Sequence, residues 1–215
     1  LLAIVANTRG ASEALQFGRV TQLGFPFSVS PSFQLRNTNR SMEESLTTVD
    51  EIQNLCTKTN KELVLYLSMA FGNPYGEIYN ADQLLGWADQ MVQKNIRVIS
   101  LADTVGVAQP NEIASVFSVL KKSHSKVSFG VHLHSSSRNW KEKLDAAYRS
   151  GCRRFDGALL GIGGCPMAND DLVGNMATEN IIDFLTEQGE QLMIDQLALK
   201  ASLKTASEIF SAEHV

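Results

Sequence analysis

The feature that most constrains the fold is a regular alternation along the chain. Short apolar runs return about every 30–35 residues, separated by stretches of helical periodicity, as in repeated strand–helix units. The runs are rich in aliphatic and β-branched residues and do not alternate with polar ones, which is typical of strands buried on both faces of a parallel sheet. We therefore predict strands near residues 1–6, 20–29, 63–69, 97–102, 127–133 and 153–159.

The stretches between these runs predict helices. Their apolar residues fall on one stripe at helical spacing. The clearest helix begins at Met42, because Ser41 and Glu44 have the spacing of a capping box, which satisfies free backbone N–H groups. Pro110 suits the first position of another helix. The predicted helices cover 42–59, 81–94, 110–122, 140–150, 178–188 and 194–212.

Six strand–helix units indicate an α/β protein of the (β/α)₈ (TIM) barrel type. A complete barrel has eight units and about 250 residues. Because this chain starts inside an apolar run and without Met, we expect a single catalytic barrel domain over 1–215 whose first strands precede Leu1. An open doubly wound sheet is the alternative, although no G-x-G-x-x-G motif follows the early strands.

Composition excludes several classes of protein. The 215 residues are 44% hydrophobic and 20% charged, which excludes a disordered chain. The net charge of −4 argues against nucleic-acid binding, and the longest apolar run, 63–71, is too short for the ~18 residues of a membrane span. Three cysteines form no disulfide framework. With no secretory signal, these features favour the bacterial cytoplasm, or the mitochondrial matrix in a eukaryote.

Two histidines end one of the predicted strands. His132 and His134 are two residues apart, so both imidazoles lie on the same face of the strand. Imidazole is a common ligand for divalent metals, and barrel active sites lie at the C-terminal ends of strands. The alternative is a pair of buried, hydrogen-bonded core histidines. His124 and His214 have polar sequence neighbours and are expected to be solvated.

One cysteine differs from the other two in its surroundings. Cys165 follows Gly161-Ile162-Gly163-Gly164, whereas Cys56 and Cys152 belong to apolar segments and are expected in the core. Glycines allow a loop to move and to approach other groups closely. A thiol with a pKa near 8.5 can act as an acid or a nucleophile, but a loop thiol without chemistry is the alternative.

Further polar residues follow strands. Asp103 and Thr104 end the strand at 97–102 and would point toward a barrel site, unless Asp103 caps the next turn or helix. Asn175 could bind a metal through its amide oxygen, or it could be an ordinary loop residue. Thr178 is expected to cap the helix that follows it.

Three of these motifs carry a family resemblance. Gly-Ile-Gly-Gly-Cys-Pro at 161–166, Val-His-Leu-His at 131–134 and Ser-Leu-Ala-Asp-Thr-Val-Gly at 100–106 resemble motifs of the 3-hydroxy-3-methylglutaryl-CoA lyases. Residues 39–45 and 72–76 match weaker landmarks, and Gly174-Asn175 follows the cysteine loop. The resemblance covers nearly the whole chain in order, and Gly-Gly-Cys-Pro with H-x-H upstream is a specific combination.

The resemblance implies a (β/α)₈ barrel that binds Mg²⁺ or Mn²⁺ and cleaves an acyl-CoA substrate to acetyl-CoA and acetoacetate. It implies a possible homodimer, with no nucleic-acid or membrane partner. By the resemblance, His132, His134 and Asn175 would be metal ligands, and Cys165 would be the catalytic thiol in a mobile loop. The remaining implied site residues are Asp103 as a catalytic residue lining the site, and Thr104 and Gly164 as substrate-binding residues.

Three departures from the family pattern keep other functions open. The family's fourth metal ligand is an Asp after an Arg, and no Arg-Asp pair occurs here. Ser135-Ser136 replaces the usual Asp-Thr, and the interval from Cys165 to Asn175 is one residue longer than expected. The alternatives are a condensing enzyme of the isopropylmalate or homocitrate synthase type, and a non-catalytic barrel derived from the lyase.

Overall fold

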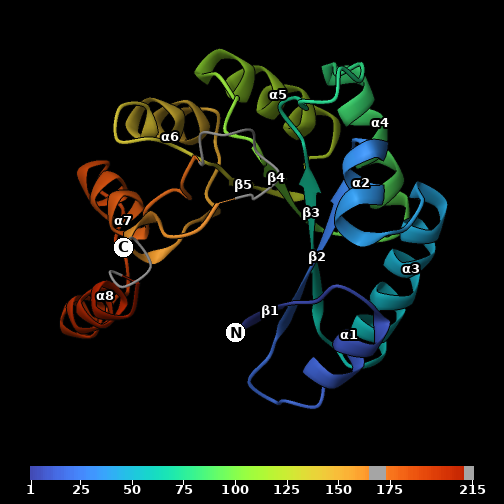
Figure 1. The fold of residues 1–215 in the computed structure, drawn as a ribbon, viewed down its shortest axis with the longest axis horizontal. Helices are drawn as coiled ribbons and strands as arrows, with labels where there is room; N and C mark the ends of the chain where they lie inside the picture. The colour runs from blue at the N-terminus through green and yellow to red at the C-terminus, as the bar shows by residue number, and fades with distance from the viewer. Residues whose placement is uncertain (165–172, 211–215) are drawn as a thin grey trace.

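The computed structural model describes residues 1–164 and 173–210. One six-stranded sheet runs in the order β1-β2-β3-β4-β5-β6, and every neighbouring pair is parallel. In Figure 1 the helices follow one another around the outside of the curved sheet, as in part of a barrel wall. The fold is an incomplete (β/α)₈ barrel. Its strands are β1 (Leu2–Ile4), β2 (Gln22–Ser28), β3 (Glu62–Ser68), β4 (Val98–Ala102), β5 (Ser128–His132) and β6 (Phe155–Asp156).

The six predicted helices are confirmed, with ends that differ by at most two residues. They are α3 (Met42–Lys58), α4 (Ala81–Gln93), α5 (Pro110–Ser123), α6 (Trp140–Arg149), α7 (Thr178–Glu187) and α8 (Gln196–Phe210). Three shorter elements were not predicted from the sequence: α1 (Thr8–Ala14), α2 (Pro31–Thr38) and the 3₁₀ helix η1 (Leu159–Gly161). Within the described ranges, no helix is long and apolar enough to cross a bilayer.

Local signals explain where the helices begin. The Ser41 hydroxyl accepts from the Glu44 backbone N–H at 3.2 Å, and the Glu44 carboxylate accepts from the Ser41 backbone N–H at 2.8 Å, so the predicted capping box is confirmed. Pro110 is the first residue of α5. The N-cap of α7 is Ala177, with no side-chain cap, so the prediction that Thr178 caps this helix is wrong.

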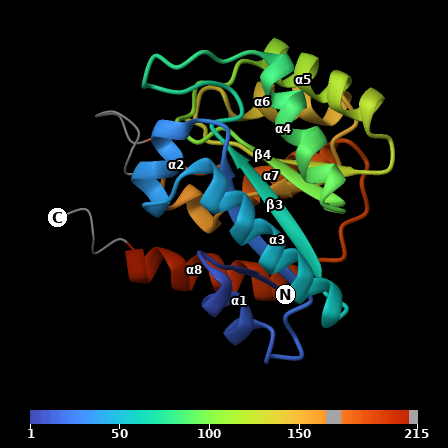
Figure 2. The same cartoon turned by 90° about the vertical axis from the view of Figure 1, so that its right-hand side faces the viewer.

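The main core lies between the sheet and the helices outside it. Figure 2 shows α3 and α4 in front of β3 and β4. Alternate strand residues such as Leu63, Leu65 and Leu67 belong to this core, together with Ile52 of α3 and Phe117 of α5. Because side chains alternate along a strand, the intervening residues, Tyr66 among them, face the inside of the curved sheet.

Two predictions differ from the structure, one for the last strand and one for a histidine at the end of α5. β6 has only two residues, Phe155 and Asp156, where 153–159 was expected. A Cβ atom at Gly157 would lie 2.7 Å from the Met176 carbonyl oxygen. The segment before α7 therefore packs closely against the chain at the point where β6 ends. His124 is half-buried and its Nε2 lies 2.6 Å from Asp89 Oδ1, which corrects the expectation of a solvated side chain. His214 lies outside the described residues.

Candidate active site

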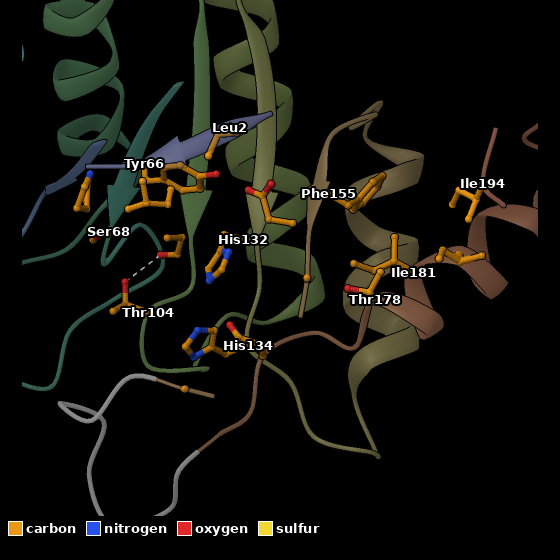
Figure 3. Close-up of a pocket in the computed structure, with 18 residues that line it drawn as sticks. Leu2, Tyr66, Ser68, Thr104, His132, His134, Phe155, Thr178, Ile181 and Ile194 are labelled. Carbon is orange, nitrogen blue, oxygen red and sulfur yellow. Dashed lines mark hydrogen bonds between the residues drawn. The ribbon is translucent and has the colours of Figure 1, made fainter. Parts of the chain in front are cut away.

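A cavity of about 750 Å³ opens on the inner face of the sheet. Its polar lining includes His132, His134, Tyr66 and Thr104, and α7 adds an apolar wall with Ile181 (Figure 3). The C-terminal ends of parallel strands meet at one edge, which is where barrel active sites lie. Other polar or backbone groups at the cavity are Ser68, Asp156, Gly164, Asn175 and Thr178.

Two imidazoles and one amide meet at this edge. His132 ends β5, and Figure 3 shows its ring beside that of His134, with 5.5 Å between the ring centroids. Asn175 forms a β-bridge with His134. The Asn175 Nδ2 donates to the carbonyl oxygen of Ile162 at 2.9 Å, which fixes the orientation of the amide. The three proposed metal ligands therefore come from two segments that the fold brings together.

Burial keeps both imidazoles neutral. It lowers the pKa of His134 to about 4, and the neighbouring His132 and Lys143 act in the same direction. Burial also lowers the pKa of His132, although Asp156 opposes that shift. A metal binds only the unprotonated imidazole, so this environment favours coordination over protonation.

The donor set fits a divalent cation. His134 Nδ1 is buried and, within the part of the chain that the structure describes, has no hydrogen-bond partner. An unpaired buried nitrogen is costly unless a ligand satisfies it. Among the described residues, no three His, Cys, Asp or Glu side chains gather as a metal site, so the available donors are two imidazoles and one amide oxygen. Nitrogen and oxygen ligands of this kind suit several divalent metals.

The neutral state of His134 predicts acid lability. The folded chain holds this imidazole neutral down to about pH 4, whereas the unfolded chain protonates it near 6.5. The unfolded state therefore binds more protons in that window, and the free energy of unfolding of the metal-free chain should fall as pH drops from 6.5 toward 4. Chemical denaturation across this range measures the effect. His134→Gln should show a flatter pH dependence, and an unchanged dependence would contradict the assignment.

Asp103 lies beneath the site rather than in the cavity lining. Its carboxylate is buried and accepts from Lys143 Nζ at 2.8 Å and from the backbone N–H of Ala108 at 3.0 Å. Lys143 Nζ also donates to the carbonyl oxygen of His134 at 2.9 Å. Burial raises the pKa of the Asp103 carboxyl, and Lys143 opposes this. Through Lys143, Asp103 helps to orient the chain at the end of β5. Its bond with Ala108 stabilises the turn after β4.

Two other predicted site residues line the cavity, and one cannot be placed. The Thr104 hydroxyl accepts from the backbone N–H of Met69 at 2.8 Å, so it links the ends of β3 and β4. Gly164 also lines the cavity. Cys165 lies outside the described residues. Cys56 and Cys152 are buried free cysteines, which confirms their expected place in the core.

A family model described as HMGL-like matches residues 2–209, almost the whole chain. The chain belongs to the HMGL-like family. The relatives that it resembles include the hydroxymethylglutaryl-CoA lyase YngG of Bacillus subtilis, 29% identical over 99% of this chain and 68% of the relative. The (R)-citramalyl-CoA lyase of Chloroflexus aurantiacus is also 29% identical, over 93% of this chain and 62% of the relative.

Solved structures of HMGL-like proteins have the same fold. The HMG-CoA lyase of Bacillus subtilis superposes with a TM-score of 0.87 at 29% identity, covering 96% of this chain and 69% of that one. The HMG-CoA lyase of Acinetobacter baumannii, solved with coenzyme A and 3-methylmalate, gives 0.84 at 26% identity, covering 96% and 67%. The cytoplasmic 3-hydroxy-3-methylglutaryl-CoA lyase of the rat is 28% identical, and this chain spans 55% of its length.

Sequence reasoning missed three residues around this HMGL-like site. Tyr66 and Asp156 line the cavity, and Lys143 lies buried beneath it. Asp156 lies inside the strand predicted at 153–159, and a carboxylate on a barrel strand could have marked it as a candidate. Lys143 gave no such signal, since a lysine in a helix usually reaches solvent.

Proposed function

We propose that residues 1–215 form a single catalytic domain of a divalent-metal-dependent carbon–carbon lyase. The proposed substrate is 3-hydroxy-3-methylglutaryl-CoA or a close 3-hydroxyacyl-CoA, and the products are acetyl-CoA and acetoacetate. The observation that carries the proposal is the meeting of two neutral imidazoles and the Asn175 amide beside a cavity of about 750 Å³. The lyase names of the relatives agree with it.

His132, His134 and the Asn175 amide oxygen would hold Mg²⁺ or Mn²⁺. Bound there, such an ion supplies a Lewis acid that polarises the substrate's tertiary hydroxyl and lowers its pKa. The protein's part is to keep both imidazoles unprotonated and the end of β5 fixed. Burial does the first, and the contact of Lys143 with the His134 carbonyl oxygen does the second.

The remaining residues would bind the substrate and move a proton. When a base takes up the proton of the hydroxyl group, the carbon–carbon bond breaks, leaving a ketone and the enolate of acetyl-CoA. We assign to Cys165 the donation of a proton to the enolate carbon, because it directly follows Gly164 of the cavity lining. Thr104 and Gly164 would contact the substrate, and Ile181 on the apolar wall would exclude water.

The similarity to a citramalyl-CoA lyase supports a second substrate. Both acyl groups carry a methyl and a hydroxyl group on the carbon next to the broken bond, and they differ by one methylene before the distal carboxylate. One methylene changes selectivity by about 10–200-fold. The walls of the cavity would therefore decide between two substrates that undergo the same bond cleavage.

Product analysis with Mn²⁺ tests the proposed function. Incubation with each acyl-CoA should release acetyl-CoA, with acetoacetate from one substrate and pyruvate from the other. Consumption of acetyl-CoA with a 2-oxo acid, and no release, would favour the condensing enzyme. Metal binding without either reaction would favour a non-catalytic barrel.

Cys165→Ser should lower kcat on the order of 10²-fold and change KM little, because the hydroxyl is a far weaker acid than the thiol. The assay is acetyl-CoA release at saturating substrate. Cys56→Ser is the matched control: it buries a hydroxyl in the core, so it should lower the thermal midpoint and leave kcat unchanged. Wild-type turnover in Cys165→Ser would remove this residue from the mechanism.

A further inference from the structure

Asp156 is an acidic residue beside the paired histidines that the proposed mechanism does not use. In the register of the sheet, Asp156 of β6 pairs with His132 of β5. Paired residues on neighbouring strands present their side chains to the same face, so the carboxylate and the imidazole share the cavity side. Both residues line the cavity.

A hydroxyl group from another strand holds this carboxylate. The Ser100 hydroxyl of β4 donates to Asp156 Oδ2 at 2.9 Å, although β5 lies between the two strands. The β5 residue paired with Ser100 is Gly130, where a Cβ atom would come within 2.9 Å of the Arg154 side chain. Burial raises the pKa of Tyr66 to about 12, with Asp156 adding to the shift, so this phenol keeps its proton at neutral pH.

The His132 ring is confined by its neighbours. Tyr66 meets it edge-on, with 6.1 Å between ring centroids and 88° between the ring planes. His134 lies at 5.5 Å from it with an angle of 61°. A carboxylate held on the strand next to a confined ring is placed to accept from one imidazole N–H, and such a contact selects one imidazole tautomer.

We propose that Asp156 is a positioning residue for the metal site, whose carboxylate orients the His132 imidazole and leaves its metal-facing nitrogen unprotonated. The inference rests on the proposed metal site. Carboxylates that act on a ligating histidine in this way typically change metal affinity by about 10–100-fold. Its negative charge also favours a cation at the site.

Mn²⁺ titration of the full chain by calorimetry tests this role. Asp156→Asn keeps the side-chain shape and an acceptor for Ser100, so it should raise the Mn²⁺ Kd by about 10–100-fold. The thermal midpoint of the metal-free variant should stay at the wild-type value. Asp156→Glu keeps the charge but moves it, and should not restore wild-type affinity. Ser100→Ala should weaken binding in the same direction, by a smaller factor.

Asp183→Asn, on the exposed face of α7, is the matched control and should bind Mn²⁺ as the wild type does. Wild-type affinity in Asp156→Asn would overturn the inference while leaving the metal site intact. A loss of Mn²⁺ affinity as large as that of His132→Ala would also overturn the inference, because it would make Asp156 a metal ligand. So would a loss of affinity accompanied by a matching fall in the thermal midpoint of the metal-free variant. A wild-type chain that binds no Mn²⁺ would overturn the proposed function, and the inference with it.

Discussion

Lys143→Met should lower the free energy of unfolding by about 3–5 kcal/mol. The side chains of Lys143 and Asp103 are only 2% and 0% exposed, and they form an ion pair of 2.8 Å. Removing the ammonium leaves a buried carboxylate without its countercharge, and also frees the carbonyl oxygens of Gly106 and His134. Single domains are stable by only about 5–15 kcal/mol, so this loss is severe.

Two further variants separate the buried charge from general effects of the substitution. Lys141→Met, on the same helix, removes an exposed ion pair with Glu187 and should cost less than about 1 kcal/mol. The double variant Asp103→Asn/Lys143→Met removes both charges and should recover part of the lost stability. Urea denaturation measures all three. A Lys143→Met variant as stable as Lys141→Met would show that the buried pair does not stabilise the fold.

His132→Ala should abolish Mn²⁺ binding at micromolar concentrations and lower acetyl-CoA release by at least about 10³-fold. The variant removes one of two imidazoles in a site with few other donors among the described residues. Loss of a direct ligand should exceed the ~10–100-fold effect of an outer residue. Because an imidazole is replaced by a methyl group in a cavity wall, the metal-free chain should still fold.

His124→Ala is the control for the loss of a histidine. His124 lies at the end of α5, where it pairs with Asp89 and does not line the cavity. This variant should keep Mn²⁺ binding and turnover at the wild-type level. Equal losses in both variants would point to a general effect on folding, and full activity in His132→Ala would exclude His132 from the site.

Much of the fold follows from the period of the apolar residues. The six strands were predictable because packing on both faces of each strand leaves continuous apolar runs. The long helices were predictable because their apolar residues fall on one stripe at helical spacing. The short helices α1 and α2 were missed because each has few buried apolar residues, although Asn7 and Ser30 do cap them. Helices of this length owe their stability to packing rather than to propensity, so their own sequence signal is weak.

The site was predictable only where its residues are neighbours in sequence. His132 and His134 stand out because two residues on a strand share a face. The pairing of Asp103 with Lys143 joins residues 40 positions apart, and the contact of Ser100 with Asp156 spans 56. The first contact depends on how α6 packs against the ends of β4 and β5. The second depends on the register of β4, β5 and β6, which is set by packing of the whole sheet rather than by any local pattern.

The most direct test of the metal site is anomalous X-ray scattering from crystals of the chain grown with Mn²⁺. We expect a peak at the cavity edge within about 2.3 Å of one ring nitrogen from each of His132 and His134, with the Asn175 amide oxygen facing it. Density for the same ion should vanish in His132→Ala crystals grown at the same Mn²⁺ concentration. A wild-type crystal at saturating Mn²⁺ with no peak between the two imidazoles, or with a peak only elsewhere, would contradict it.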